Sequence, residues 1–251
     1  MIILKTDEMI EGMHESGKLL ASVHRELRKK ILPGVTTLQL DKFVEDYLLK
    51  HGATPEQKGY EGFPFSICAS VNDEICHGFP RAEKLKEGDI VTIDMVVNLN
   101  GYLSDSAWSY AVGEISEEKR KLLDATKESL YKAIEIVNEN ARLGDIGNAI
   151  QSYVEPLGFS VVREFVGHGI GKDMHEDPQV LHYGKKGRGQ RLCRGMVFTI
   201  EPMINIGTHR LKIDSNGWTA RTLDGSMSTQ YEHTIAIKST GEVLVLTEQD
   251  E

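Results

Sequence analysis

The chain has 251 residues, of which 40% are hydrophobic and 27% are charged, and its formal net charge at pH 7 is -9. This composition is typical of a globular protein, and a chain of this length can bury a large core without disulfide support. Specific nucleic-acid binding is not expected, because such binding depends on clustered Lys and Arg contacts to phosphate, and the excess of acidic residues provides no such surface.

The cysteines and the apolar runs indicate the compartment. The three cysteines form no Cys-x-x-Cys pair, and an odd number argues against a disulfide scaffold; they are Cys68, Cys76 and Cys193. The apolar run at residues 1–4 is too short for a signal peptide. No apolar stretch approaches the ~20 residues that a membrane span requires. The sequence therefore predicts a cytoplasmic protein that does not associate with a membrane.

Two helices are predicted in the first 52 residues. Thr6 can accept a hydrogen bond at the start of the first helix, and two acidic residues place negative charge in its first turn. Apolar residues then recur at helical spacing until Pro33 and Gly34 break the pattern. The second helix carries its apolar residues on one face and is expected to end near Gly52.

The remaining elements repeat this order. Residues 60–112 combine β-branched alternation with Gly and Asn turns, which predicts strands and hairpins. Ser116 is expected to open a third helix, and Leu143-Gly144 is expected to interrupt the helical pattern before a fourth helix that ends at Gly158. Strand and turn signals then return. The chain therefore has two consecutive sets of helix, helix and sheet.

A local match between the two halves favours an internal duplication. Residues 88–94 are Gly-Asp-Ile-Val-Thr-Ile-Asp, and residues 195–201 are Gly-Met-Val-Phe-Thr-Ile-Glu, so both segments lead from a glycine through Thr-Ile to a carboxylate. Together with the repeated order of elements, this match predicts one α+β domain over residues 1–251. We expect two pseudo-repeats, about residues 1–112 and 113–251, related by pseudo-twofold symmetry.

Two carboxylates fall close together in the first half. Asp94 interrupts the apolar run at residues 90–97, which predicts a buried strand, and a buried ionised carboxylate needs a compensating charge. The turn-rich residues 98–101 predict a hairpin, in which a loop of two or four residues puts Asp105 on the same face as Asp94. The two would be directly opposed or diagonal, which is unfavourable unless a cation lies between them.

The second half supplies three matching residues. Glu201 ends a predicted strand at residues 196–200, Glu232 lies within the strand-like run 228–237, and His168 lies in a Gly-His-Gly segment. Taken alone, Asp94 is also compatible with an edge or bulge position, Asp105 with a turn and His168 with a loop. Four carboxylates and one imidazole together suit divalent ions such as Mn, Fe, Co or Zn, and four negative charges balance two such ions.

These residues and their surroundings resemble the metallopeptidases of the pita-bread fold. The fragments that carry the resemblance are Ile93-Asp94, Ser104-Asp105, Gly167-His168-Gly169-Ile170-Gly171, Thr199-Ile200-Glu201-Pro202-Met203 and Gln230-Tyr231-Glu232-His233-Thr234. Residues 70–78 and 174–180 resemble the methionine aminopeptidases specifically. The sequence shows neither a Cys-rich zinc-binding extension nor the long helical insertion of the type II enzymes, and in this it resembles the bacterial type I form. The similarity covers about residues 5–237 and implies a pita-bread (creatinase and aminopeptidase) fold, an internally duplicated α+β architecture of helix, helix and antiparallel sheet.

The resemblance also implies a metal site. Its expected ligands to two divalent ions are Asp94, Asp105, His168, Glu201 and Glu232. Asp105 and Glu232 would bridge the ions, His168 and Glu201 would complete the coordination of one ion, and Asp94 would complete that of the other. A water molecule activated by the ions would attack the scissile carbonyl, and Glu201 would carry its proton toward the leaving amine.

Further residues are implied for substrate binding. His175 would donate a hydrogen bond to the carbonyl oxygen, a contact typically worth ~3 kcal/mol in the transition state, and His77 would contact the next peptide nitrogen. An apolar pocket for the methionine side chain is expected to be lined by Tyr60, Phe63, Cys68 and Trp218, with His77 near its rim. Met174 and His175 complete the expected substrate-binding residues. Met174 stands where many members of the family have an aromatic residue, so the resemblance does not define the shape of the pocket at this position.

The implied activity is methionyl aminopeptidase, which removes the initiator methionine of nascent proteins when the second residue is small. The expected partners are nascent polypeptides close to the ribosome, and the expected state is a cytoplasmic monomer. Two alternatives share the fold. A proline-directed aminopeptidase uses the same five ligands but normally carries an extra N-terminal domain, and a non-catalytic binding module usually lacks some of the ligands.

Overall fold

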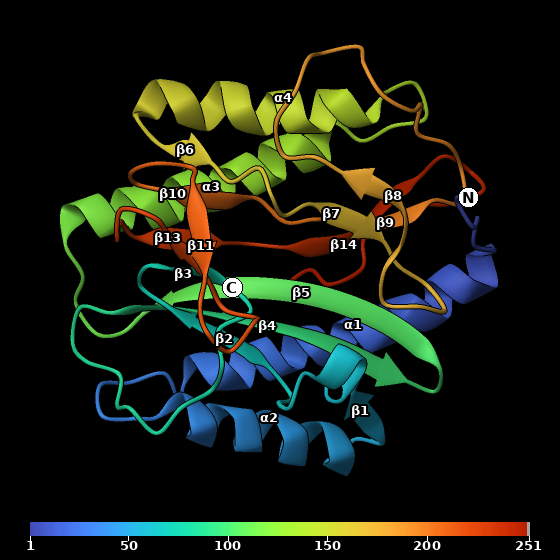
Figure 1. Ribbon diagram of the computed structural model, residues 1–251. Coiled ribbons are helices and arrows are strands. Elements are labelled where there is room, and N and C mark those ends of the chain that lie inside the picture. The colour runs from blue at the N-terminus through green and yellow to red at the C-terminus, as the bar shows by residue number, and fades with distance from the viewer. Residues whose placement is uncertain (250–251) are drawn as a thin grey trace.

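The computed structural model describes residues 1–249 and contains two pairs of helices (Figure 1). The first pair is α1 (Asp7–Arg28) and α2 (Thr37–Lys50), and the second pair is α3 (Glu117–Ile136) and α4 (Leu143–Val154). The short 3-10 turn η1 (Tyr60–Gly62) lies between two strands, and η2 (Glu155–Leu157) follows α4 directly. None of the helices in residues 1–249 is both long enough and apolar enough to cross a membrane.

Side-chain caps define where three of the helices begin. The Thr6 hydroxyl accepts the backbone N–H of Met9, and the Ser116 hydroxyl accepts that of Lys119, as the sequence predicted for the first and third helices. At the start of α2, Thr36 and Gln39 satisfy each other's backbone N–H groups in a capping box.

The predicted break before the fourth helix is displaced. The chain leaves α3 after Ile136, and Leu143 and Gly144 are the first residues of α4 rather than an interruption. A Cβ atom at residue 144 would lie 2.7 Å from the carbonyl oxygens of both Lys185 and Arg188. The close approach of a neighbouring loop to the helix therefore explains the glycine. The predicted start of the fourth helix was wrong because the glycine was interpreted as a helix breaker.

Two larger sheets carry most of the strands. In the first, β4 (Ile90–Leu99) pairs along one edge with β1 (Ala53–Pro55) and β2 (Cys68–Val71) and along the other with β5 (Tyr102–Ala111). The second has the order β15-β14-β9-β7-β8, with bounds Val243–Val245, His233–Ile237, Val197–Ile200, Gly167–Gly169 and Glu176–Val180.

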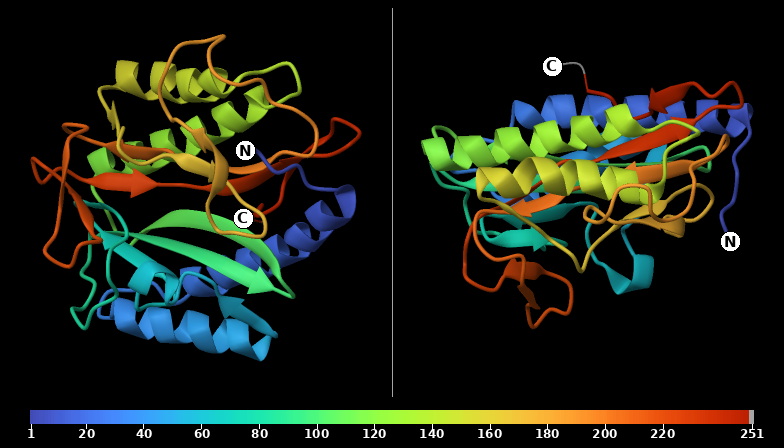
Figure 2. Two further views of the ribbon diagram at one scale, coloured as in Figure 1. Left: turned by 45° about the vertical axis from the view of Figure 1, so that its right-hand side comes forward. Right: turned by 90° about the horizontal axis from the view of Figure 1, so that it is seen from above.

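Two three-stranded sheets complete the strand layer. The first has the order β13-β10-β6, with bounds Ser228–Gln230, Met203–Asn205 and Ser160–Val161. The second has the order β11-β12-β3, with bounds Leu211–Ile213, Ala220–Thr222 and Glu74–Cys76. In the right-hand view of Figure 2, α1 and α3 lie along one side of the strands, and the β11–β12 hairpin and η1 project from the other.

The central strand pairs of the two halves, β4 with β5 and β9 with β14, begin in the same way. Gly88 precedes β4 and Gly195 precedes β9, and their φ angles of 87° and 84° lie in the left-handed region that favours glycine. Each donates its N–H to a carbonyl at the end of the partner strand, Gly88 to Val112 at 2.9 Å and Gly195 to Ile237 at 2.7 Å. The α+β fold with two matching halves is thus confirmed, and the proposed boundary at residue 112 stays a prediction.

The two halves join along β5 and β14. The Asp105 N–H donates to the Thr234 hydroxyl at 3.0 Å, and this hydroxyl donates to the Asp105 carbonyl at 2.8 Å. One continuous buried apolar cluster includes side chains from all four helices and from both larger sheets, among them Leu27, Val44, Ile93, Leu130, Ile150 and Phe198. The seam between the halves is therefore a fixed structure, on which side chains from either half can meet.

The run at residues 228–237, predicted as one strand, is two strands in different sheets. Strand β13 ends at Gln230 and β14 begins at His233, so Tyr231 and Glu232 lie in the break. The Glu232 N–H donates to the carbonyl of Ala107 in β5 at 2.8 Å. The chain thus changes sheets at the carboxylate, which brings Glu232 beside the first half of the molecule.

Two buried histidines make the stability of the fold depend on pH. His24 in α1 contacts the Tyr110 hydroxyl at 2.8 Å, and His233 in β14 contacts the Thr247 hydroxyl at 2.9 Å; neither side chain is exposed. Burial lowers the pKa of His24 to about 4 and that of His233 to about 3. Both are therefore neutral in the folded protein throughout the range in which an unfolded histidine, of pKa about 6.5, gains its proton.

Because the unfolded chain binds more protons below about pH 6.5, the free energy of unfolding should fall from there to about pH 4. The slope is at most about 1.4 kcal/mol per pH unit for each histidine. Urea unfolding of the wild type and of H24Q/H233Q at pH 7, 6 and 5 measures this contribution. The variant should lose less stability on acidification, and an equal loss in both proteins would contradict the prediction.

Candidate metal and substrate site

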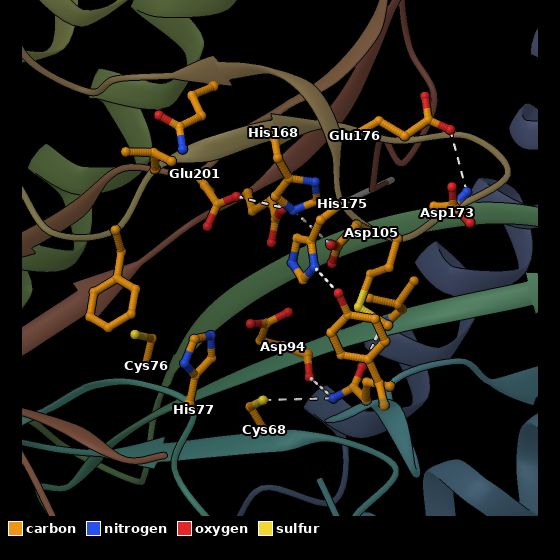
Figure 3. Close-up of a pocket in the computed structure, with 18 of the residues that line it drawn as sticks. Cys68, Cys76, His77, Asp94, Asp105, His168, Asp173, His175, Glu176 and Glu201 are labelled. Atoms are coloured by element: carbon orange, nitrogen blue, oxygen red, sulfur yellow. Dashed lines mark hydrogen bonds and ion pairs between the residues drawn. The ribbon is translucent and has the colours of Figure 1, made fainter. Parts of the chain in front are cut away.

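A cavity of about 770 Å³ opens between the two halves of the molecule. Figure 3 shows that its labelled side chains come from both halves and converge on a common space. The residues predicted for metal binding, catalysis and substrate binding all line this one cavity; they are Tyr60, Phe63, Cys68, His77, Asp94, Asp105, His168, Met174, His175, Glu201, Trp218 and Glu232.

The hairpin of β4 and β5 fixes the relation between the first two carboxylates. Asp94 pairs with Ala107 and Asp105 pairs with Val96, so the two carboxylates are diagonal neighbours on one face of the sheet. The loop has two residues, Asn100 and Gly101, with φ angles of 55° and 84° as a type I′ turn requires. Of the arrangements predicted from the sequence, the diagonal one is correct.

His168 faces carboxylates from both halves. Its Nε2 atom lies 3.5 Å from Oδ2 of Asp105 and 3.6 Å from Oε1 of Glu201. Its Nδ1 atom lies 3.0 Å from the carbonyl oxygen of Gly169, which can only accept a hydrogen bond. The proton of the neutral ring is therefore held on Nδ1, and the lone pair of Nε2 points toward the carboxylates, as in a histidine that binds metal.

Glu201 follows the last residue of β9 and is held from three sides. Its Oε1 accepts the Thr199 hydroxyl at 2.8 Å, and its Oε2 accepts the side-chain amide of Gln230 at 3.3 Å. Its backbone N–H donates to Nε2 of the buried His182 at 3.1 Å. The position of this carboxylate is thus set by neighbouring groups even without a cation.

Two buried oxygens test whether the residues fit a metal ion. Oδ1 of Asp105 and Oε1 of Glu232 have no hydrogen-bond partner among the described residues, which is costly for buried polar atoms. One ligand atom from each of Asp105, His168 and Glu232 lies within 4.8 Å of the other two. Carboxylate oxygens and an imidazole nitrogen are the donors that borderline divalent cations prefer, so the residues fit such an ion.

The electrostatics of the site agree with that fit. Burial raises the pKa of Asp94 and of Glu232 well above their usual range, and the nearby carboxylates of Asp105 and Glu201 raise both further. Burial also raises the pKa of Glu201. For His168, burial acts to lower the pKa, but the hydrogen bond to Asp105 and the charge of Glu201 raise it to about 9. The site therefore has an excess of negative charge that protons or cations must neutralise.

Aromatic and sulfur-containing side chains form another wall of the cavity. The rings of Phe63 and Trp218 meet edge to face with centroids 5.1 Å apart, and Cys68 pairs with Asp94 across β2 and β4. His77 has a positive φ of 55°, and its ring lies 5.3 Å from that of Phe165. Burial lowers the pKa of His77 to about 4, so this ring is neutral at pH 7.

His175 lies between the carboxylates and the aromatic wall. Its ring centroid is 4.4 Å from that of His168, and its Nδ1 atom is 3.0 Å from the Tyr60 hydroxyl. Burial and the charge of His168 lower its pKa. When the Tyr60 hydroxyl donates to Nδ1, the neutral ring carries its proton on Nε2, which makes that nitrogen a hydrogen-bond donor.

The sequence did not single out several residues that also line the cavity. Gln57 accepts the Val96 N–H at 2.6 Å and donates to the Asp94 carbonyl at 3.2 Å, so it supports the strand that carries Asp94. No sequence motif marks Gln57. Gln230 and Met203 lie within the fragments that contain Glu232 and Glu201. Their closeness in sequence to these carboxylates could have indicated that they line the cavity.

Known proteins share this architecture and sequence. The model of metallopeptidase family M24 matches residues 11–239. The chain is 52% identical over 247 residues to a methionine aminopeptidase of Clostridium perfringens, with 98% of this chain and 99% of the relative covered. It is 51% identical over 241 residues to methionine aminopeptidase 1 of Bacillus subtilis, with 96% and 97% covered.

Solved structures give the same result. The methionine aminopeptidase from Rickettsia prowazekii has a TM-score of 0.97 and 41% identity, with 99% of this chain and 100% of that chain covered. The prolidase from Pyrococcus furiosus has a TM-score of 0.78 and 21% identity, which shows a shared fold alone; 99% of this chain covers 66% of that one. The chain belongs to metallopeptidase family M24 and, within it, to the methionine aminopeptidases.

Proposed function

We propose that this protein releases the N-terminal methionine of polypeptides by hydrolysis, using two divalent metal ions. The observation that carries the proposal is that a buried cluster of carboxylates and an imidazole lines the same cavity as a group of apolar and aromatic side chains. Divalent cations, when bound by such a cluster, lower the pKa of a water molecule and polarise the carbonyl that it attacks.

Five residues would hold the ions, which we propose to be Co, Mn, Fe or Zn. They are Asp94, Asp105, His168, Glu201 and Glu232. The unpartnered oxygens of Asp105 and Glu232 support a central position for these two residues. The four carboxylates supply the negative charge that two divalent cations neutralise, and burial from water strengthens each of these attractions.

Three residues would act on the substrate. Glu201 accepts a proton and passes it to the leaving amine. His175 donates a hydrogen bond to the carbonyl oxygen while negative charge develops there. His77, which is neutral and half-buried at the cavity wall, contacts the peptide nitrogen beyond the cleaved bond.

The apolar wall would hold the methionine side chain. Tyr60, Phe63, Cys68, Met174 and Trp218 present rings, a thiol and a thioether, all of which pack well against a thioether. Tyr60 packs against the buried apolar cluster that contains Met174, so one face of the pocket is continuous with the core. The flexible Met174 side chain lets that face adjust to its occupant.

We further propose that the protein is a cytoplasmic monomer that meets nascent chains near the ribosome and removes methionine when the second residue is small. Support comes from the cysteines: Cys68, Cys76 and Cys193 form no disulfide within residues 1–249, which fits a reducing compartment.

Hydrolysis of a small peptide panel tests the proposed activity. After chelation and return of Mn or Co, Met-Gly-Met-Met should be cleaved at least about tenfold more efficiently than Leu-Gly-Met-Met, because the pocket distinguishes two apolar side chains by shape. Metal-dependent cleavage of Ala-Pro peptides instead would assign a proline-directed aminopeptidase. A folded protein without turnover under either metal would indicate a binding module and overturn the proposal.

A further inference from the structure

A buried ion pair lies behind the loop that carries His175. The Lys5 ammonium group pairs with Glu176, and the two side chains are only 1% and 4% exposed. Glu176 follows His175 directly in the chain, and Figure 3 shows the His175 ring directed toward the carboxylates while the Glu176 side chain is directed away from them. The pair therefore sits on the opposite side of the same loop from the reacting groups.

Glu176 also closes the loop on itself. Its Oε1 atom accepts the backbone N–H groups of Lys172 and Asp173, at 2.9 and 3.3 Å, while Oε2 faces Lys5. The Gly171 N–H donates to the Asp173 carbonyl at 3.2 Å. One carboxylate thus joins the start and the end of the turn that presents Met174 and His175 to the cavity.

Lys5 is held just as firmly from the other side. Its backbone N–H donates to the Gly195 carbonyl at 2.7 Å, and its ammonium also donates to the Ile3 carbonyl at 2.8 Å. A Cβ atom at residue 171 would lie 2.2 Å from Cε of Lys5, so any larger residue there would displace the lysine side chain. Lys5 therefore connects the turn to Gly195, the residue at which the approach to β9 and Glu201 begins.

We propose that Lys5 and Glu176, which we call the Lys5–Glu176 clamp, are positioning residues for His175. This inference rests on the proposed role of His175 as a hydrogen-bond donor to the substrate carbonyl. The clamp fixes the turn relative to β9, and through it the distance from the His175 ring to the carboxylates that end and flank this strand. A shift of about 1 Å in a group that stabilises the transition state can lower the rate by as much as a hundredfold.

The test is a mutant cycle between the clamp and His175. K5M alone leaves the carboxylate of Glu176 buried without its cation, which is strongly destabilising, so K5M/E176Q is compared as well. In that double variant the amide oxygen can still accept the two backbone N–H groups of the turn, and no unpaired charge remains. R194M, which breaks the exposed pair of Arg194 and Glu139, is the matched control.

Four quantities are measured for each protein: kcat and KM on Met-Gly-Met-Met, the affinity for Mn by calorimetry, and Tm. K5M/E176Q should lower kcat about tenfold, which is less than the loss expected when one hydrogen-bond donor to the oxyanion is removed completely. The affinity for Mn and KM should each change by less than about twofold. In the H175A background the same two substitutions should change kcat by less than about twofold, because the group that they position is gone. R194M should match the wild type in kcat.

Three results would overturn the clamp as a positioning device: a wild-type kcat in folded K5M/E176Q, a tenfold loss that recurs in the H175A background, or a loss that follows weakened Mn binding. If His175 does not donate a hydrogen bond to the substrate carbonyl, H175A alone would keep the wild-type kcat, so this failure can be distinguished from failure of the clamp. Loss of Met release in the wild-type protein itself would remove the proposed function before the cycle begins.

Discussion

The variant E232Q is expected to bind Mn or Co at least about a hundredfold more weakly than the wild type. Mutation of a residue that only supports a metal ligand typically weakens binding by about tenfold to a hundredfold, and loss of a ligand should cost at least as much. The metal-free variant should nevertheless be more stable than the metal-free wild type. Glu232 is buried beside Asp94, Asp105 and Glu201, and its raised pKa shows that the negative charge is disfavoured there. An amide of the same shape removes one charge from this cluster.

Relief of about 1 kcal/mol would raise Tm by about 2–4 °C in a protein of this size. Thermal unfolding with excess chelator and with added metal measures both effects in one experiment. E164Q is the matched control, because Glu164 lines the same cavity but is exposed to solvent, and it should alter neither value. A metal-free E232Q that melts below the metal-free wild type would contradict a metal role for the carboxylate cluster.

The variant H175A is expected to lower kcat by about a hundredfold to a thousandfold while leaving the affinity for metal unchanged. The ring centroid lies 4.4 Å from that of His168, a proposed metal ligand. The proposed hydrogen bond to the substrate carbonyl strengthens only as negative charge develops on that oxygen. The effect should therefore appear in kcat rather than in KM.

Y60F provides the matched variant for this prediction. Loss of the hydroxyl that contacts Nδ1 of His175 at 3.0 Å should lower kcat by a smaller factor, about tenfold, because the ring remains but loses the partner that orients it. Steady-state kinetics with metal titration separates the two effects. If H175A changes metal affinity and kcat together, His175 supports the metal site, and the proposed contact with the substrate is wrong.

Local chemistry in the sequence was sufficient to predict much of the fold. The caps at Thr6 and Ser116 and the Asn100-Gly101 turn depend on interactions within a few residues, so a pattern can identify them. The two-residue period of a strand predicted that Asp94 and Asp105 share a face, but it left a direct or a diagonal relation open. The two-residue loop at Asn100-Gly101 makes the relation diagonal. The repeated Gly-to-carboxylate segment identified equivalent strands in the two halves.

Contacts between distant segments were beyond the same reasoning. The start of α4 depends on the loop that approaches Gly144, and the break in the strand at Glu232 depends on β5. The pairing of Lys5 with Glu176 joins residues 171 positions apart. Composition and periodicity contain no information on such approaches, and the convergence of both halves on one cavity was predicted only through the resemblance to a known fold.

The most direct test of the central claim is a titration of the chelated protein with Mn, in which bound metal and the rate of Met release from Met-Gly-Met-Met are followed together. The account predicts no activity without metal, a rise in activity that parallels binding, and saturation at two equivalents per chain, with both signals lost in E232Q. Activity that persists after complete removal of metal, or stoichiometric binding without release of methionine, would contradict it.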